Sequence, residues 1–220
     1  MRINKWWIAG GAGLLVLLTG KKAAAQAVEV VKGLKMDKQG KWAADFVTKA
    51  QPICDKYGLP IQICVAQAAL ESAWGTKAPG GNYFGIKGKG PAGSTNVTTK
   101  EEFTPGTTTT IKDNFAAYDS AEQSIEGWCK FVTTERYIPP EGAGVASRML
   151  WIWARGYATA SQYPSSIVGV AASVAKRIGP QFKIDMSAPQ KQLAKELGAL
   201  KPLARQKRAL ELAALKQWPL

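Results

Sequence analysis

The strongest constraint on the fold is an apolar segment, Pro60–Trp74, in which Glu71 is the only charged residue. Proline suits the first position of a helix, and Gly75 follows where a helix has to end. Because the residues between them are almost all apolar, the segment predicts a helix at the centre of the core. The pattern thus places one carboxyl group at the end of a buried helix.

A carboxyl group in that position has unusual acid–base properties if it faces a cleft. Partial burial disfavours the charged form and raises the pKa of a glutamic acid. A raised pKa is what a general acid needs at neutral pH, and protonating a glycosidic oxygen is one natural task for Glu71. The alternative is a partly exposed glutamate at a helix end, with no chemical role.

Four further segments have the periodicity of helices that bury one face. Apolar residues recur in them at every third or fourth position. Gly58 ends the first segment and Gly179-Pro180 ends the last, as helix terminators do. The predicted helices are Lys41–Tyr57, Ser120–Val132, Val145–Arg155 and Pro164–Ile178.

Between these helices lies a stretch rich in glycine and threonine that predicts a β-hairpin. Its strands are Asn96–Phe103 and Thr107–Tyr118, and the first carries Glu101 and Glu102. Adjacent strand residues face opposite sides, so only one of the two glutamates points inward. A glycosidase needs a second carboxylate about 5 Å from the first for retention, or about 6.5–9.5 Å for inversion. Paired glutamates on a strand are otherwise typical of a solvated face.

The chain contains no histidine. This absence excludes Ser-His-Asp triads, Cys-His thiol proteases and His-ligated zinc hydrolases. Acid–base chemistry at neutral pH therefore falls to carboxylates, lysines, tyrosines or cysteines.

Three cysteines, Cys54, Cys64 and Cys129, lie in apolar, helix-like stretches. We expect them to be small buried residues without a chemical role. One disulfide with a spare thiol is the alternative.

The net charge of +13 is concentrated at the two ends of the chain. Residues 1–40 and residues 187–220 each carry seven basic and two acidic side chains, whereas the part between them carries 15 basic and 12 acidic ones. A nucleic-acid groove would need the excess on the folded domain, so we expect no nucleic-acid partner.

Residues 1–27 have the pattern of a segment that directs a chain to a membrane. Arg2 and Lys5 precede a short uncharged run, 6–20, which two lysines follow. The pattern favours an uncleaved signal anchor, with a cleaved signal peptide and a buried N-terminal helix as alternatives. Either signal places the rest of the chain outside the cytoplasm, and residues 28–40 then form a linker.

The C-terminal tail, residues 187–220, has leucines at helical spacing among basic residues. Pro202 marks the start of a second helix within it. This basic amphipathic pattern predicts two helices that either pack across the main domain or dock on an anionic membrane or a partner helix.

Several motifs together resemble glycoside hydrolase family 73, the flagellar-rod and autolysin type of endo-β-N-acetylglucosaminidase. The resemblance covers roughly residues 42–180, and two of its motifs are long and correctly separated. The matching segments are Ala66–Gly75 (AQAALESAWG), Asn82–Gly88 (NYFGIKG), Phe115–Ser120 (FAAYDS), Arg136-Tyr137 and Gly156–Thr159 (GYAT).

This resemblance implies a lysozyme-like fold and cleavage of the β-1,4 bond between N-acetylglucosamine and N-acetylmuramic acid in peptidoglycan. Glu71 matches the catalytic acid of the family, and Glu102, followed by an aromatic residue, fits the second acid better than Glu101. Tyr157 matches a tyrosine of the substrate cleft. The chain departs from the family pattern at Ala160, where an aspartate is common.

Four more residues within these motifs are candidates for substrate binding. Trp74, Tyr83 and Phe84 offer aromatic faces on which sugars stack, although core packing explains Trp74 and Phe84 equally well. Asn82 lies beside them in the same motif. We expect no metal and no cofactor.

We therefore expect a mainly helical fold with a small β-hairpin lobe (α+β, lysozyme-like). Its parts are the membrane-directing segment 1–27, the linker 28–40, a catalytic domain at 41–186 with a flap at about 95–118, and the tail 187–220.

Two alternatives to the glucosaminidase function stay open. One is a lytic transglycosylase or muramidase on the same fold, and the other is a catalytically weak structural or glycan-binding component. Two settings fit, an inner-membrane-anchored enzyme of the bacterial envelope and a membrane-associated part of a phage virion. In either one the expected partners are peptidoglycan and a membrane, and a protein that binds the C-terminal helix is a further alternative.

Overall fold

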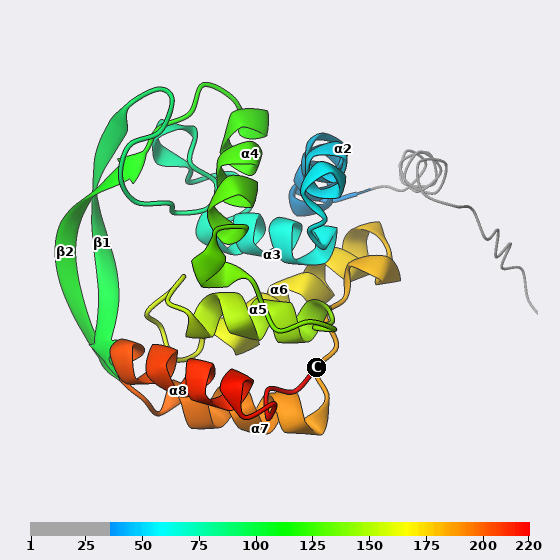
Figure 1. Ribbon diagram of the computed structural model, residues 1–220. Coiled ribbons are helices and arrows are strands. Elements are labelled where there is room, and N and C mark those ends of the chain that lie inside the picture. The colour runs from blue at the N-terminus through cyan, green and yellow to red at the C-terminus, as the bar shows by residue number, and fades with distance from the viewer. Residues whose placement is uncertain (1–35) are drawn as a thin grey trace, which may run out of the picture.

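The computed structural model describes residues 36–220 as a body of helices flanked on one side by a long β-hairpin (Figure 1). The prediction of a mainly helical fold with one hairpin is confirmed. The helices are α2 (Lys38–Tyr57), α3 (Ile61–Glu71), α4 (Ala121–Val132), α5 (Val145–Ala154), α6 (Tyr163–Ile178), α7 (Ala188–Gly198) and α8 (Pro202–Ala214). The strands are β1 (Ser94–Thr104) and β2 (Thr107–Ala116), and short 3-10 turns occupy Pro79–Gly81, Glu135–Tyr137 and Pro180–Phe182.

The predicted N-terminal segment 1–27 and most of the linker lie outside the described residues. Within residues 36–220, no helix is both long and apolar enough to cross a membrane.

The central helix predicted from the sequence is α3. All of its residues from Ile63 to Ala69 are buried, and α2, α5 and α6 pack around it. The helix begins one residue later than predicted, because Pro60 is its extended N-terminal cap. It ends at Glu71, which fixes the carboxyl group at the edge of the core.

The chain reverses direction sharply after Glu71. Ala73 and Trp74 adopt positive φ angles of 48° and 59°, and Gly75 follows with a φ of 76°. A Cβ atom at Gly75 would lie 2.1 Å from Nε1 of Trp42, so only glycine allows the chain to pass this indole. The reversal leads directly into the loop that faces the Glu71 carboxyl group.

The β-hairpin is a two-stranded antiparallel sheet whose register pairs Ser94 with Ala116 and Glu101 with Thr109. The register shifts between Glu101 and Thr104, just before the turn. Every second residue of β1 up to Glu101 lies on the more buried face. β1 is therefore longer than predicted at both ends, whereas β2 begins at the predicted residue and ends two residues earlier.

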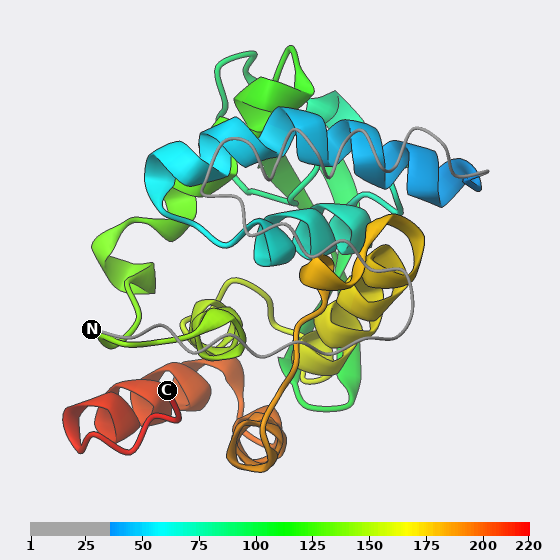
Figure 2. The ribbon, with the colours of Figure 1, turned by 90° about the vertical axis from the view of Figure 1, so that its right-hand side faces the viewer.

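The C-terminal tail folds back onto the main domain. Ser187 and Gln190 form a capping box at the start of α7, and α7 and α8 both pack against α5. Figures 1 and 2 show this helix pair against one end of the helical body. Its buried apolar residues are Leu193, Leu197, Ala209, Leu212 and Trp218. The tail is therefore packed across the main domain, which was one of the two predicted arrangements. Contact of the tail with a membrane or a partner helix stays a prediction.

The three cysteines are buried and free, as predicted. Cys54 comes from α2, Cys64 from α3 and Cys129 from α4, and all belong to the hydrophobic core.

Candidate active site

Glu71 is the last residue of α3, and two neighbours surround its carboxyl group. Oε1 accepts a hydrogen bond of 2.9 Å from the hydroxyl of Tyr163. Oε2 faces Gly85, where an added Cβ atom would lie 3.3 Å away. Gly85 has a φ of 63°, so both the backbone conformation and the space favour glycine at this position.

The surroundings of Glu71 raise the pKa of its carboxyl group to about 7. The largest cause is desolvation by the protein atoms packed around the carboxyl group, although the residue as a whole is exposed at the surface. The hydrogen bond from Tyr163 opposes this shift, and the negative charge of Glu101 adds to it. At neutral pH the group is therefore divided between its protonated and ionised forms.

Two tyrosines lie beside this carboxyl group. Tyr163 is buried, and its ring centroid is 6.0 Å from that of Tyr157. The hydroxyl of Tyr157 donates a hydrogen bond of 2.7 Å to the carbonyl of Phe84. Burial raises the pKa of both phenols well above the usual value, so both remain hydrogen-bond donors. Tyr163 was not predicted, because nothing in its sequence context distinguishes it from an ordinary core aromatic residue.

Glu101 is the inward-facing glutamate of the hairpin. Its side chain is held by Nζ of Lys87, 2.8 Å from Oε1, and by the hydroxyl of Thr159, 2.6 Å from Oε2. Lys87 also pairs with Asp113 on β2 at 2.9 Å. Because the charge of Glu101 raises the pKa of Glu71, the two carboxyl groups belong to one electrostatic site.

Glu102 is half-buried and contacts backbone amides. Its Oε1 accepts from the amide of Gly106 at 2.8 Å, and its Oε2 accepts from the amide of Ser161 at 3.2 Å. Desolvation is the largest single effect on the pKa of Glu102 and raises it, but the hydrogen bonds from Gly106 and Ser161 together with the charge of Arg205 outweigh it and hold the pKa below its usual range. Glu101 is the more buried of the two glutamates, at 9% exposed, whereas Glu102 is half-buried.

Asn82 and Phe84, two of the predicted substrate-binding residues, have structural contacts. The Asn82 side chain donates to the carbonyls of Ile86 and Ala116 and accepts from the amides of Phe84 and Ile86. The ring of Phe84 is 1% exposed and stacks on Trp128 with centroids 5.2 Å apart. A ring buried to this extent has no face free for a sugar, so the core-packing alternative describes Phe84.

Trp74 and Tyr83 are only partly buried. Trp74 makes an edge contact with Trp42 at 5.9 Å, and the guanidinium of Arg177 lies 5.3 Å from its ring centroid. The Tyr83 ring packs against Phe46 at 5.5 Å. Both keep exposed surface, although packing already uses part of each ring.

A buried arginine of the tail, Arg205, supports the loop that carries Tyr157 and Thr159. Arg205 is 1% exposed, and its guanidinium lies 4.2 Å from the ring centroid of Trp153. Desolvation lowers the pKa of Arg205 to about 10. Its hydrogen bonds of 3.1–3.4 Å go to the carbonyls of Ala158, Thr159, Leu197 and Leu200. The sequence analysis counted Arg205 only among the basic residues of the tail and did not predict its burial.

Residues 36–220 contain no cluster of three or more histidine, cysteine, aspartate or glutamate side chains that could hold a metal ion. The polar groups gathered at the site are carboxyl groups, phenols, one threonine hydroxyl and one lysine. Such a set suits proton transfer and the stabilisation of positive charge.

Comparisons with known proteins agree with this chemistry. The family model described as mannosyl-glycoprotein endo-beta-N-acetylglucosaminidase matches residues 47–176. The peptidoglycan hydrolase FlgJ of Vibrio cholerae is 30% identical over 143 residues, which cover 59% of this chain and 43% of the relative. A probable N-acetylmuramidase of Lactococcus lactis is 37% identical over 85 residues, 37% of this chain and 19% of that protein. The chain thus spans less than half the length of these relatives.

A solved structure supports the same relationship. The catalytic domain of the autolysin Auto from Listeria monocytogenes has a TM-score of 0.51 and 28% sequence identity, and the match covers 71% of this chain and 96% of that domain. The family match includes α3, the hairpin, α4, α5 and most of α6 and ends before α7. Because this match spans more than half of the residues, the chain belongs to the glucosaminidase family of glycoside hydrolases.

Proposed function

We propose that this protein hydrolyses peptidoglycan at the β-1,4 bond between N-acetylglucosamine and N-acetylmuramic acid. The relatives named peptidoglycan hydrolase support the substrate, and the glucosaminidase family supports the bond. The observation that carries the proposal is the raised pKa of Glu71, about 7, at the end of a buried helix.

Glu71 acts as the general acid. The protonated carboxyl group donates its proton to the glycosidic oxygen, and the leaving sugar departs as an alcohol. Oε1 is engaged by Tyr163, so Oε2, which lies beside Gly85, is the oxygen better placed to carry the proton. After transfer, the Tyr163 hydroxyl stabilises the carboxylate that has formed.

We assign the role of second carboxylate to Glu101, in place of Glu102, which the sequence favoured. Glu101 is the one of the pair whose charge acts on Glu71, and Lys87 and Thr159 fix its orientation. Both carboxylate oxygens of Glu102 instead accept hydrogen bonds from backbone amides. Glu101 then either activates the attacking water or steadies an acetamido group that acts as internal nucleophile.

Three aromatic residues complete the proposed site. Tyr157 lies beside Tyr163 and is a candidate to hold the acetamido group or to orient water. Trp74 and Tyr83 are only partly buried and are candidates to stack on sugar rings.

A muramidase or lytic transglycosylase is the second candidate function, and the similarity to the Lactococcus lactis protein favours considering it. Mass spectrometry of the released glycan ends separates the alternatives. A reducing N-acetylglucosamine end supports the proposal, a reducing N-acetylmuramic acid end indicates a muramidase, and an anhydro end indicates a transglycosylase.

The cellular setting is a further part of the proposal. We propose that residues 1–27 anchor the enzyme in a membrane, with the catalytic domain outside the cytoplasm of a bacterium or on a phage virion. Carbonate extraction of membranes and analysis of purified virions test these two settings. Release of the full chain by carbonate, together with its absence from virions, would contradict both.

Clearing of a turbid suspension of purified peptidoglycan tests the proposed function. Glu71→Gln should reduce the rate by about 10²–10⁴-fold, the usual contribution of a general acid. Glu122→Gln, an exposed change of the same kind on α4, is the matched control and should clear as wild type does. Equal clearing by Glu71→Gln and wild type would refute the assignment, and binding without any released product would support a glycan-binding component instead.

A further inference from the structure

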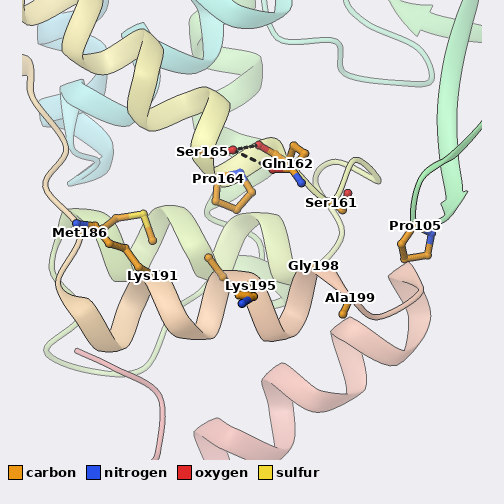
Figure 3. A pocket seen from close by; sticks show the side chains of 11 residues that line it. Pro105, Ser161, Gln162, Pro164, Ser165, Met186, Lys191, Lys195, Gly198 and Ala199 are labelled. Carbon is orange, nitrogen blue, oxygen red and sulfur yellow. Dashed lines mark hydrogen bonds between the residues drawn. The ribbon is translucent and has the colours of Figure 1, made fainter.

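A cavity of about 510 Å³ lies between the hairpin turn, the start of α6 and one side of α7. Figure 3 shows Pro105 at one edge, Pro164 and Ser165 opposite α7, and Lys191 and Lys195 on that helix. None of these residues has a role in the proposed chemistry.

The cavity adjoins the proposed active site through two short connections. Gln162 and Pro164 line it, and between them Tyr163 bonds the carboxyl group of Glu71. Ser161 also lines it, and the amide of Ser161 bonds Glu102. A substituent of a glycan strand bound at Glu71 would therefore be within reach of the cavity.

The described lining residues include two cations and no carboxylate. Lys191 and Lys195 are one helical turn apart on α7, and both are exposed. Neither has a carboxylate within 4.0 Å anywhere in residues 36–220. The first turn of α6, with the hydroxyl of Ser165, adds the positive end of a helix dipole. The cavity thus has two exposed lysines above partly apolar walls, and the carboxylate at its edge, Glu102, is already bound to the backbone amides of Gly106 and Ser161.

Peptidoglycan offers a ligand of complementary charge. Its N-acetylmuramic acid residues carry short peptide stems, and those stems bear free carboxylates beside small apolar side chains. We propose that this cavity binds a carboxylate-bearing part of the peptide stem attached to the glycan strand under cleavage. The proposal rests on the proposed function and adds to it a preference for strands that keep their stems.

The wall with the two lysines lies outside the part of the chain that the family model matches. That match ends at residue 176, and α7 begins at Ala188. The tail therefore adds a proposed binding surface that lies outside the segment matched by the glucosaminidase family model.

The test compares two substrates: glycan strands with intact stems, and the same strands after an amidase has removed the stems. Wild type should have the higher kcat/KM on the first. In the double variant Lys191→Glu/Lys195→Glu, the ratio of the two kcat/KM values should fall about five- to tenfold, as expected for reversing two partly exposed charge contacts. Lys191→Gln/Lys195→Gln should give a smaller loss in the same direction.

The matched control is Lys207→Glu/Lys216→Glu, which reverses two exposed charges of the tail outside the cavity. It should keep the wild-type ratio. An unchanged ratio in the cavity variants, or an equal loss on both substrates, would overturn the inference while leaving the hydrolase intact. Failure of wild type to cleave either substrate would instead contradict the proposed function.

A second inference comes from a different observation, the chain of contacts that starts at Arg205. The guanidinium of Arg205 binds the carbonyl of Thr159, and the hydroxyl of Thr159 binds Glu101. The same hydroxyl accepts a hydrogen bond of 3.0 Å from the amide of Glu102. A single threonine thus connects the tail to the second carboxylate.

We infer that Arg205 is a positioning residue, which acts on Glu101 through Thr159. A buried guanidinium is costly to desolvate, so its retention needs several acceptors, and here two of the four belong to the loop of the active site. The tail is then part of the catalytic unit.

A double-mutant cycle tests this inference. Arg205→Met and Thr159→Ala should each lower kcat about tenfold with KM within about twofold, because orientation affects the chemical step. The double variant should be no slower than the slower single variant, since both act through one contact. Thr159→Ser, which keeps the hydroxyl, should restore most of the rate.

Multiplicative losses in the double variant, or a loss confined to KM, would overturn the positioning role. Thermal melting of each variant separates misfolding from loss of orientation. If Arg205→Met does not fold, Arg205→Lys takes its place in the cycle, and equal rates for Thr159→Ser and Thr159→Ala then count against the inference.

Discussion

The end of α3 and the inner face of the hairpin each present one carboxyl group, in opposite surroundings. Glu71 has a phenol and a glycine beside it and no cation within 4.0 Å among the described residues, and its pKa rises to about 7. Glu101 has an ammonium group and a hydroxyl at hydrogen-bond distance. The protein thus treats two chemically identical side chains differently.

The difference indicates a division of roles. An environment that raises the pKa of Glu71 suits a proton donor, whereas an ammonium group and a hydroxyl at hydrogen-bond distance orient Glu101 as a base or an electrostatic stabiliser. The charge at Glu101 also helps to keep the proton on Glu71, so each position depends on the other. Variants that change the surroundings of only one of the two carboxyl groups test this division of roles.

The largest effect is expected from the glutamates of the hairpin. Glu101→Gln should lower kcat by about 10²–10³-fold, because it removes the charge that faces Glu71. Glu102→Gln should cost less than about fivefold, since that side chain only ties the hairpin to the neighbouring loop. Turnover of soluble glycan strands measures both, and the reverse order would return the second-acid role to Glu102.

Removing the cation beside Glu101 should have the next largest effect. Lys87→Met leaves Glu101 and Asp113 without their shared partner, and we expect kcat to fall about tenfold. Lys89→Met, an exposed change two residues away, is the control. Comparable rates for the two variants would mean that the ion pair does not support the second carboxylate.

Tyr163 tunes the pKa of Glu71, the proposed proton donor. Its hydrogen bond lowers the pKa of Glu71, so Tyr163→Phe should move that pKa above about 7. The alkaline limb of kcat/KM should move to higher pH, with a loss of severalfold at the optimum. Tyr157→Phe, whose hydroxyl bonds the Phe84 carbonyl, should leave the position of the limb unchanged. A limb that stays in place in Tyr163→Phe would contradict the assigned contact.

The smallest effect concerns stability. The pKa of Glu71 is higher in the folded chain than the usual 4.5, so its contribution to stability is complete below about pH 4.5 and is lost as the pH rises through about 7. Glu71→Gln should therefore raise Tm by a few degrees relative to wild type at pH 8 and not at pH 4. Thermal melts at both pH values check this, and an equal difference at the two pH values would contradict the shift.

The sequence predicted those parts of the fold that depend on the periodicity of apolar residues within a single segment. The apolar run gave α3 and the place of Glu71, and alternation in β1 predicted that one glutamate of the pair faces inward. Which one does so depends on pairing with Thr109 and on contact with Thr159, 58 residues further along the chain. The resemblance to the family favoured Glu102 because an aromatic residue follows it, and that match contains no information about strand pairing.

Contacts between distant segments account for the features that were missed. Tyr163 binds Glu71 although 92 residues separate them in the chain, and a tyrosine at the start of a helix has no local feature that indicates such a role. Arg205 counted only as one charge in a basic tail, although it is almost fully buried. A charged residue carries no signal of burial until its acceptors are known, and here they come from two separate segments.

The most direct test of the account is the pKa of Glu71 itself, measured by NMR titration of the side-chain carboxyl carbon in wild type, Glu101→Gln and Glu102→Gln. The account predicts a value near 7 in wild type, a lower value in Glu101→Gln, and no comparable decrease in Glu102→Gln. A wild-type value near the usual 4.5, or the same decrease in both variants, would contradict the division of roles between the two carboxyl groups.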